Sequence, residues 1–168
     1  MADKGLDSLF YDTLRDMYYA ERHILKTLPQ LEAAAVSDEL KAAFRTHLGE
    51  TEGQIGRLEQ VFAMIDRKPV SKRCEAIDGI LKEGDGVLED YRDTVALDAG
   101  LISSAQAVEH YEITRYGTLR RWAKMLGLPD ANDLLTASLE EESRTDELLT
   151  KIADAEANAR AATQRKSA

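Results

Sequence analysis

The chain has 168 residues, of which 43% are hydrophobic and 32% are charged, and its formal net charge at pH 7 is −9. These values indicate one globular domain with a sizeable core and exclude a disordered chain. The negative charge argues against nucleic acid as the main partner and suits a protein that handles cations. Alanine, leucine, glutamate, lysine and arginine are frequent and there are only three prolines, so we predict an all-α fold.

The sequence also predicts a compartment. Its single cysteine, Cys74, excludes an internal disulfide and fits a reducing environment. The N-terminus lacks the apolar segment of a leader peptide, and no apolar run approaches the length of a membrane span. We therefore expect a cytoplasmic protein without a membrane partner.

The first helix is expected over residues 6–35, capped by Asp7 or Ser8. Its apolar stripe has alternating gaps of four and three residues, which is the spacing of a helix face turned toward a core. The stripe is Phe10, Leu14, Met17, Glu21, Ile24, Leu28 and Leu31. Glu21 is the only charged residue on this stripe and lies at its centre. Pro29 predicts a kink or a weak point, since it removes one backbone donor.

A second helix is expected over residues 37–66, with Ser37 as its cap. Its stripe is Leu40, Phe44, His47, Thr51, Ile55, Leu58, Phe62 and Ile65. His47 lies on this stripe, and Glu50 borders it one turn later. Because the link to the first helix is only a residue or two, the two helices should form an antiparallel hairpin.

Residues 67–93 read as a crossover that returns the chain along the bundle. Pro69 and Ser71 end the second helix, and residues 74–82 predict a short helix. Gly84 and Gly86 are then expected to loosen the chain.

A third main helix is expected over residues 94–126, ended by Gly127 and Pro129. Two carboxylates, Glu109 and Glu112, lie one turn apart in the middle of its apolar stripe. The stripe is Asp98, Ile102, Ala105, Glu109, Glu112, Tyr116, Leu119, Ala123 and Leu126. Asp98 lies near the helix start, so we interpret it as a charge that suits a helix N-terminus and not as a metal ligand.

The fourth main helix is expected over residues 131–156, started by Asp130 or Asn132, and its stripe is Leu135, Leu139, Glu142, Asp146, Leu149 and Ala153. Two acids again lie in mid-stripe. The polar tail, 157–168, is expected to fray.

Four long helices with two short links and one long crossover predict a ferritin-like four-helix bundle. Each long helix carries an acid or an imidazole near the middle of its buried stripe. Burying a carboxylate costs several kcal/mol unless something compensates it, and neighbouring carboxylates are compensated by a shared proton or a cation. We therefore predict a metal site, and carboxylates with a histidine suit iron or manganese. The candidate ligands are Glu21, His47, Glu50, Glu109, Glu112, Glu142 and Asp146.

Five features along the chain stand out together: YAERHILKTLPQL at 19–31, HLGETEGQIGRLEQVF at 47–62, the single Cys74, VEHYEITRYGTL at 108–119 and EEESRTDELL at 140–149. In these features the chain resembles the YciF-type ferritin-like stress proteins. The resemblance covers nearly the whole chain. It implies a ferritin-like bundle with a short extra helix in the crossover, a homodimer, and a di-metal centre of poorly defined activity.

The pattern is more distantly similar to rubrerythrin, whose third helix carries a Glu-x-x-Glu step matched here by Glu109 and Glu112. Glu21, Glu50 and Glu142 match that family's glutamates on the other three helices. Two departures stand out: Asp146 occupies the position of a histidine, and Gly53 stands where a ferritin-type Glu-x-x-His step needs one. Six carboxylates exceed the charge of two divalent ions. We therefore expect Asp146, or one of the pair on the third helix, to keep a proton or to stay off the metal.

Two functions follow from these observations. In the first, two divalent ions, iron foremost and otherwise manganese or zinc, lie between the helices and support metal oxidation by dioxygen or peroxide. Glu50 and Glu112 would bridge the ions, whereas Glu21, His47, Glu109 and Glu142 would each bind one. In the second, the chain is a non-catalytic, stress-induced helical dimer with a degenerate metal site, and its function is contact with other proteins. The sequence leaves open whether any reaction is catalysed.

Overall fold

The computed structural model describes residues 4–163, and within that range the chain is all-helical with no strand. Among residues 4–163, no helix combines the length and the apolar composition that spanning a bilayer requires. The elements are α1 (Leu6–Ala34), α2 (Asp38–Met64), α3 (Glu75–Asp90), α4 (Leu97–Met125), α5 (Pro129–Ile152), a short π-helical segment η1 (Ala153–Ala157) and α6 (Asn158–Ala162).

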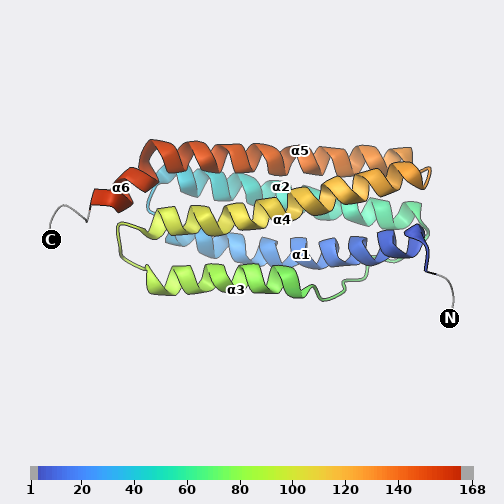
Figure 1. Ribbon diagram of the computed structural model, residues 1–168, viewed down its shortest axis with the longest axis horizontal. Helices are drawn as coiled ribbons and strands as arrows, with labels where there is room; N and C mark the ends of the chain where they lie inside the picture. Colours follow the sequence, from blue (N-terminus) through green and yellow to red (C-terminus); the bar gives the residue numbers. More distant parts are fainter. Residues whose placement is uncertain (1–3, 164–168) are drawn as a thin grey trace.

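Helices α1, α2, α4 and α5 run side by side along the long axis of the molecule (Figure 1). The pairs α1–α2 and α4–α5 are antiparallel hairpins, as their short links predict. Because α2 ends at one end of the bundle and α4 begins at the other, the crossover must span the molecule, and α3 carries the chain back beside α1 and α4 (Figure 1). This connectivity is ferritin-like, which confirms the predicted fold.

The four main helices bury two separate apolar clusters. One cluster contains Ile24, Leu28, Phe44 and Leu101, and the other contains Phe10 together with residues that α2, α4 and α5 contribute. Along each of the four helices, the predicted polar stripe residues fall between the stretches that feed the two clusters. The bundle therefore has a polar layer between two apolar layers, and this layer is where the candidate site lies.

The crossover differs from its prediction. Helix α3 continues to Asp90, so Gly84 and Gly86 lie inside it and do not loosen the chain. Gly84 is buried, and a Cβ atom built on it would lie 3.5 Å from the Cβ of Ser104. Gly84 therefore faces α4 at an ordinary van der Waals distance, and the burial of this helix face outweighs the low helix propensity of glycine.

Several predicted helix ends are confirmed and others are corrected. Ser37 caps α2, because its hydroxyl accepts a hydrogen bond from the Leu40 N–H, and Gly127 has a φ of +74° after the end of α4. Helix α1 runs through Pro29 to Ala34. Helix α5 starts at Pro129, and Asn132 donates to the Arg120 carbonyl oxygen instead of capping the helix.

The predicted fraying from residue 157 is wrong as far as Ala162, because η1 and α6 continue the helix. Arg160 on α6 donates to Asp98 at 3.2 Å and pairs with Glu156. Residues 164–168 of the predicted tail lie outside the described residues.

Candidate metal site

Four of the predicted ligands converge in the polar layer of the bundle. They are His47 on α2, Glu109 and Glu112 on α4, and Glu142 on α5, and one ligand atom from each lies within 4.8 Å of the others. All four side chains are almost completely buried. The stripes position them because each residue takes the central place on the inward face of its helix.

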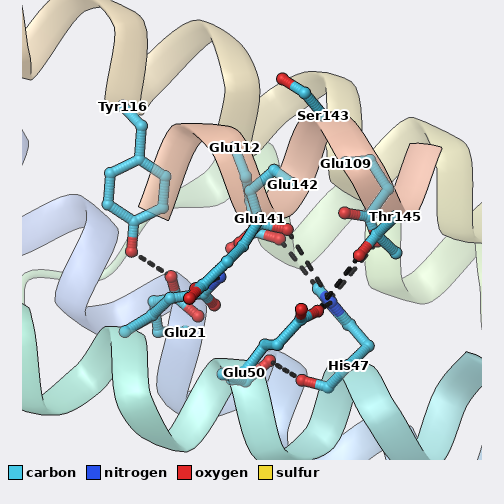
Figure 2. A network of polar contacts seen from close by, with 12 residues as sticks. Glu21, His47, Glu50, Glu109, Glu112, Tyr116, Glu141, Glu142, Ser143 and Thr145 are labelled. Carbon is cyan, nitrogen blue, oxygen red and sulfur yellow. Dashed lines mark hydrogen bonds and ion pairs between the residues drawn. The ribbon is translucent and has the colours of Figure 1, made fainter. Parts of the chain in front are cut away.

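The imidazole of His47 lies among carboxylates (Figure 2). Its Nε2 atom is 3.5 Å from Glu109 Oε1 and 3.9 Å from Glu112 Oε2. On the other side of the ring, Nδ1 is 3.8 Å from Glu142 Oε2 and 3.9 Å from Glu50 Oε2. Each ring nitrogen therefore faces two carboxylates, and the ring could bind a cation through either nitrogen.

Most ligand atoms of this cluster lack a hydrogen-bond partner. Both nitrogens of His47, both carboxylate oxygens of Glu112, and one oxygen each of Glu109 and Glu142 are buried and unpartnered. Buried polar atoms are normally hydrogen-bonded, and a missing ion is one of the recognised reasons for an exception. An imidazole with several carboxylates is a donor set that iron, manganese and zinc accept. The residues present therefore fit a divalent metal.

Burial shapes the charge of the cluster when it holds no metal. Burial, followed by repulsion from Glu142, raises the pKa of Glu112 well above its usual value, and the same two causes raise the pKa of Glu109. Burial also raises the pKa of Glu142 to about 7 and lowers the pKa of His47 to about 4. Without a cation, the cluster consequently holds protons on carboxyl groups and a neutral imidazole.

Glu21 on α1 extends the cluster. It is fully buried, its Oε1 accepts a hydrogen bond from the Tyr116 hydroxyl, and its Oε2 has no partner. Burial, followed by the charge of Glu142, raises its pKa well above the usual value, and the hydrogen bond from Tyr116 acts in the opposite direction. Figure 2 shows the Tyr116 hydroxyl pointing at Glu21, so Tyr116 holds one oxygen and leaves the other free.

Glu50 lies at the edge of the cluster. Its side chain is 24% exposed, and its Oε2 accepts a hydrogen bond from the Thr145 hydroxyl at 3.3 Å. Because that oxygen is also 3.9 Å from His47, Glu50 connects the buried ligands with the surface. Burial and the neighbouring Glu141 raise its pKa.

Asp146 is directed away from this cluster. Its Oδ1 accepts a hydrogen bond from Gln106 Nε2 at 2.9 Å, and its Oδ2 lies 3.2 Å from the exposed His110. The buried row of α5 passes through Thr145 and not through Asp146. The predicted stripe of this helix was therefore displaced by one residue at that turn.

The sequence analysis missed Gln54, which is fully buried and donates hydrogen bonds to Glu142 and Glu141. Arg57 pairs with Glu141 and donates to the Ser138 hydroxyl at 2.9 Å. Gln54 lies seven residues after His47, so it occupies the same helix face, and this spacing could have identified it. The predicted stripe has Ile55 on that face instead, and Ile55 is only half-buried.

Comparison with known proteins places the chain in a family. The family profile described as "Domain of unknown function (DUF892)" matches residues 5–162. The chain belongs to the DUF892 family. Protein YciF of Escherichia coli K12 is 40% identical over 151 residues, which is 89% of this chain and 91% of YciF.

Solved structures agree with this assignment. This DUF892 chain matches the crystal structure of YciF, described as an E. coli stress protein, with a TM-score of 0.86 at 40% identity over 90% of this chain and 96% of that one. YcfI of Rhodopseudomonas palustris matches with a TM-score of 0.85 at 43% identity, over 89% and 96% of the chains. A Xanthomonas campestris protein at 18% identity and TM-score 0.73, over 95% and 98%, supports the fold alone. The resemblance inferred from the sequence motifs is thus confirmed.

Proposed function

We propose that this DUF892 chain is a stress-associated metal-binding protein whose centre is the buried cluster of His47, Glu109, Glu112 and Glu142. The observation that carries the proposal is the set of unpartnered ligand atoms in that cluster. A divalent ion would satisfy these atoms and neutralise the carboxylates together, which no side chain among residues 4–163 does. The stress role is taken from the description of the YciF structure.

The proposed centre holds two ions, iron foremost, with manganese or zinc as the other candidates. Glu21 has an unpartnered oxygen, and Glu50 has an oxygen 3.9 Å from His47, so each has an oxygen to contribute when a second ion binds. Glu112, with both oxygens unpartnered at the middle of the cluster, suits a bridging role. Because the structure gives Asp146 other partners, we leave it out of the ligand set.

A bound pair of iron ions would supply the electrons for a reaction with dioxygen or peroxide. The chain's own residues would do three things around it. The carboxyl groups exchange protons for metal, the two apolar clusters keep bulk water away, and Tyr116 orients Glu21. Repeated turnover of either oxidant by the iron-loaded protein would make it an oxidase or a peroxidase.

The alternative is a non-catalytic helical dimer in which protons replace the metal. Its support is specific: Gln54 donates to Glu142, Tyr116 donates to Glu21, and the pKa of each central carboxyl group is raised. A homodimer remains a prediction under both proposals, and the cytoplasm remains our prediction for its compartment.

Metal analysis of purified protein, loaded with iron(II), manganese(II) or zinc(II) and then desalted, separates the two proposals. We expect near-stoichiometric metal in the parent, a loss of most of it in Glu112→Ala, and a partial loss in Glu50→Ala. Asp146→Asn is the matched control and should retain the parent's content, because its side chain has partners outside the cluster. A parent that holds none of the three metals after loading would establish the alternative.

A further inference from the structure

A small cavity adjoins the candidate site on the side of the first apolar cluster. Its volume is about 20 Å³, and residues from all five long helices line it. The apolar lining includes Ile24, Leu28, Phe44, Ala105, Val108 and Leu149, and the site contributes His47 and Glu109. The cavity therefore ends directly at two of the proposed ligands.

The walls of this cavity offer almost nothing to a polar guest. Two hydroxyl groups line it, and both are already donating: Thr27 Oγ1 to the His23 carbonyl oxygen at 3.0 Å, and Thr145 Oγ1 to Glu50 at 3.3 Å. The unpartnered polar atoms belong to His47 and Glu109, at the end where the site begins. Once those two residues bind metal, few of their nitrogen and oxygen atoms remain free to hydrogen-bond a molecule in the cavity.

Size and polarity together select the guest. A cavity must offer roughly 10–15 Å³ to accept one water-sized molecule, and a buried water typically needs 2–4 polar partners. The cavity passes the first condition and fails the second along its apolar length. Hydrogen peroxide has two hydroxyl groups and would lose more hydrogen bonds than water on entry. A small apolar molecule loses none.

We propose that this cavity binds dioxygen immediately beside His47 and Glu109. Dioxygen is apolar, is only moderately larger than a water molecule, and is one of the two oxidants that the proposed function admits; the cavity volume of about 20 Å³ exceeds the minimum for one water molecule. The binding itself follows from the walls of the cavity. That the cavity supplies dioxygen to a metal centre rests on the proposed function. If the cavity binds dioxygen and the cluster binds metal, dioxygen and not peroxide is the oxidant that reaches the ions through the protein interior.

Paramagnetic relaxation by dissolved dioxygen tests the binding directly. Methyl NMR relaxation is measured under nitrogen and then under dioxygen pressure, in metal-free protein and in protein supplied with zinc, which does not react with dioxygen. We expect a several-fold larger increase in relaxation for Ile24, Leu28 and Val108 than for matched methyl groups. Leu88 and Leu97 are the controls, because each is 4% exposed, like Leu28, and neither lines the cavity.

Filling the cavity is the second arm of the test. Ala105→Leu places three extra carbon atoms in the cavity from α4, and Ala43→Leu fills the cavity from α2. The control is Ala123→Leu, which is also on α4 but lies in the second apolar cluster, away from the cavity. The two filling variants should lose the excess relaxation at Ile24 and Leu28, whereas the control should keep it, with thermal unfolding used to confirm that each variant folds.

Equal relaxation of the lining and control methyl groups in the parent would overturn this inference, whatever the metal content. The converse result, normal dioxygen binding in a parent that takes up no metal, would overturn the proposed function and leave the cavity assignment standing.

Discussion

Tyr116 is the largest fully buried side chain next to the candidate site, and its hydroxyl group donates to Glu21. Burial, followed by the charges of Glu21 and Glu112, raises the pKa of Tyr116 well above its usual value, so the hydroxyl keeps its proton and remains a donor. When a buried carboxyl oxygen loses its hydrogen-bond donor, the folded state is destabilised by the full desolvation penalty of that oxygen. Tyr116 therefore stabilises the bundle and aims Glu21 at the same time.

Tyr116→Phe should lower the free energy of unfolding by about 1–3 kcal/mol, because it leaves a buried oxygen of Glu21 without its donor. It should also weaken metal binding, since Glu21 becomes free to turn. Urea unfolding and metal titration measure the two effects. The matched control is Tyr18→Phe, whose hydroxyl donates to the more exposed Glu59 at 2.8 Å and whose loss should cost less. Equal losses in the two variants would contradict the special role of Tyr116.

At the scale of the helices, Asp98 joins three elements. Its Oδ1 accepts from the Val36 N–H at 2.8 Å and its Oδ2 accepts from the Ser37 N–H at 2.9 Å, so it binds the link between α1 and α2. Arg160 on α6 donates to the same carboxylate. Its place near the start of α4 predicts a charge that serves its own helix, whereas its carboxylate serves the start of α2.

Asp98→Ala should therefore cost about 2–4 kcal/mol of unfolding free energy, because it removes the acceptor of two backbone N–H groups and leaves Arg160 without that partner. Amide hydrogen exchange at Ser37 should accelerate in parallel. Asp154→Ala, at an exposed acid of η1, should change stability by less than about 0.5 kcal/mol. If the two variants were equally stable, the contact would not be holding the end of the bundle.

The glycines of α3 and α4 differ in the space around them. A Cβ atom on Gly100 would lie 2.6 Å from Val87 Cγ1, whereas nothing lies within 4 Å of a Cβ on Gly79. Gly79→Ala should therefore raise stability by up to about 1 kcal/mol through helix propensity. Gly100→Ala should lower it by about 1–3 kcal/mol, because valine is stiff in a helix and cannot easily move aside. Thermal unfolding of both variants checks the opposite signs.

Hydrophobic patterning predicts the buried face of some helices of this bundle better than that of others. On α1 and α4 the predicted stripes, Glu21, Glu109 and Glu112 included, are the buried rows, apart from their last residues. On α5 the prediction chose Leu139 and Asp146 over Ser138 and Thr145, since gaps of three and four are both helical. Ser138 and Thr145 are buried because their hydroxyl groups bond to Arg57 and Glu50 on α2. Such partners come from another helix, so a pattern within one helix cannot reveal them.

At the scale of the whole molecule, the polar layer lowers the stability of the bundle while it provides the groups that would bind metal. Two apolar clusters hold the helices together, and between them lie carboxyl groups that would repel each other if all were ionised. The sequence predicted this layer because an acid or an imidazole interrupts each of the four stripes near its middle. It did not predict which carboxyl groups keep protons, because that depends on burial and on distances across the bundle.

The metal-free protein should consequently lose stability as the pH rises from about 6.5 to about 8. The folded pKa of Glu142 is about 7, and those of Glu21, Glu109 and Glu112 are raised well above 4.5, so the folded state binds more protons than the unfolded state in this range. Stability falls with pH wherever the folded state binds more protons. His47, with a folded pKa of about 4 against 6.5, acts in the opposite sense mainly between about pH 4 and about pH 7, where stability rises with pH on its account.

Bound metal should reverse this fall of stability with pH. The metal replaces the protons on the carboxyl groups, and fewer protons compete with it for these groups as the pH rises. The difference in melting temperature between metal-loaded and metal-free protein should therefore widen from about pH 6.5 to about pH 8. Scanning calorimetry of both forms across this range measures it, and Glu142→Gln should flatten the metal-free slope, whereas the exposed neighbour Glu140→Gln should not. A metal-free melting temperature that rose with pH would show that the carboxyl groups are ionised without a cation, and would remove the electrostatic reason for placing a metal between the helices.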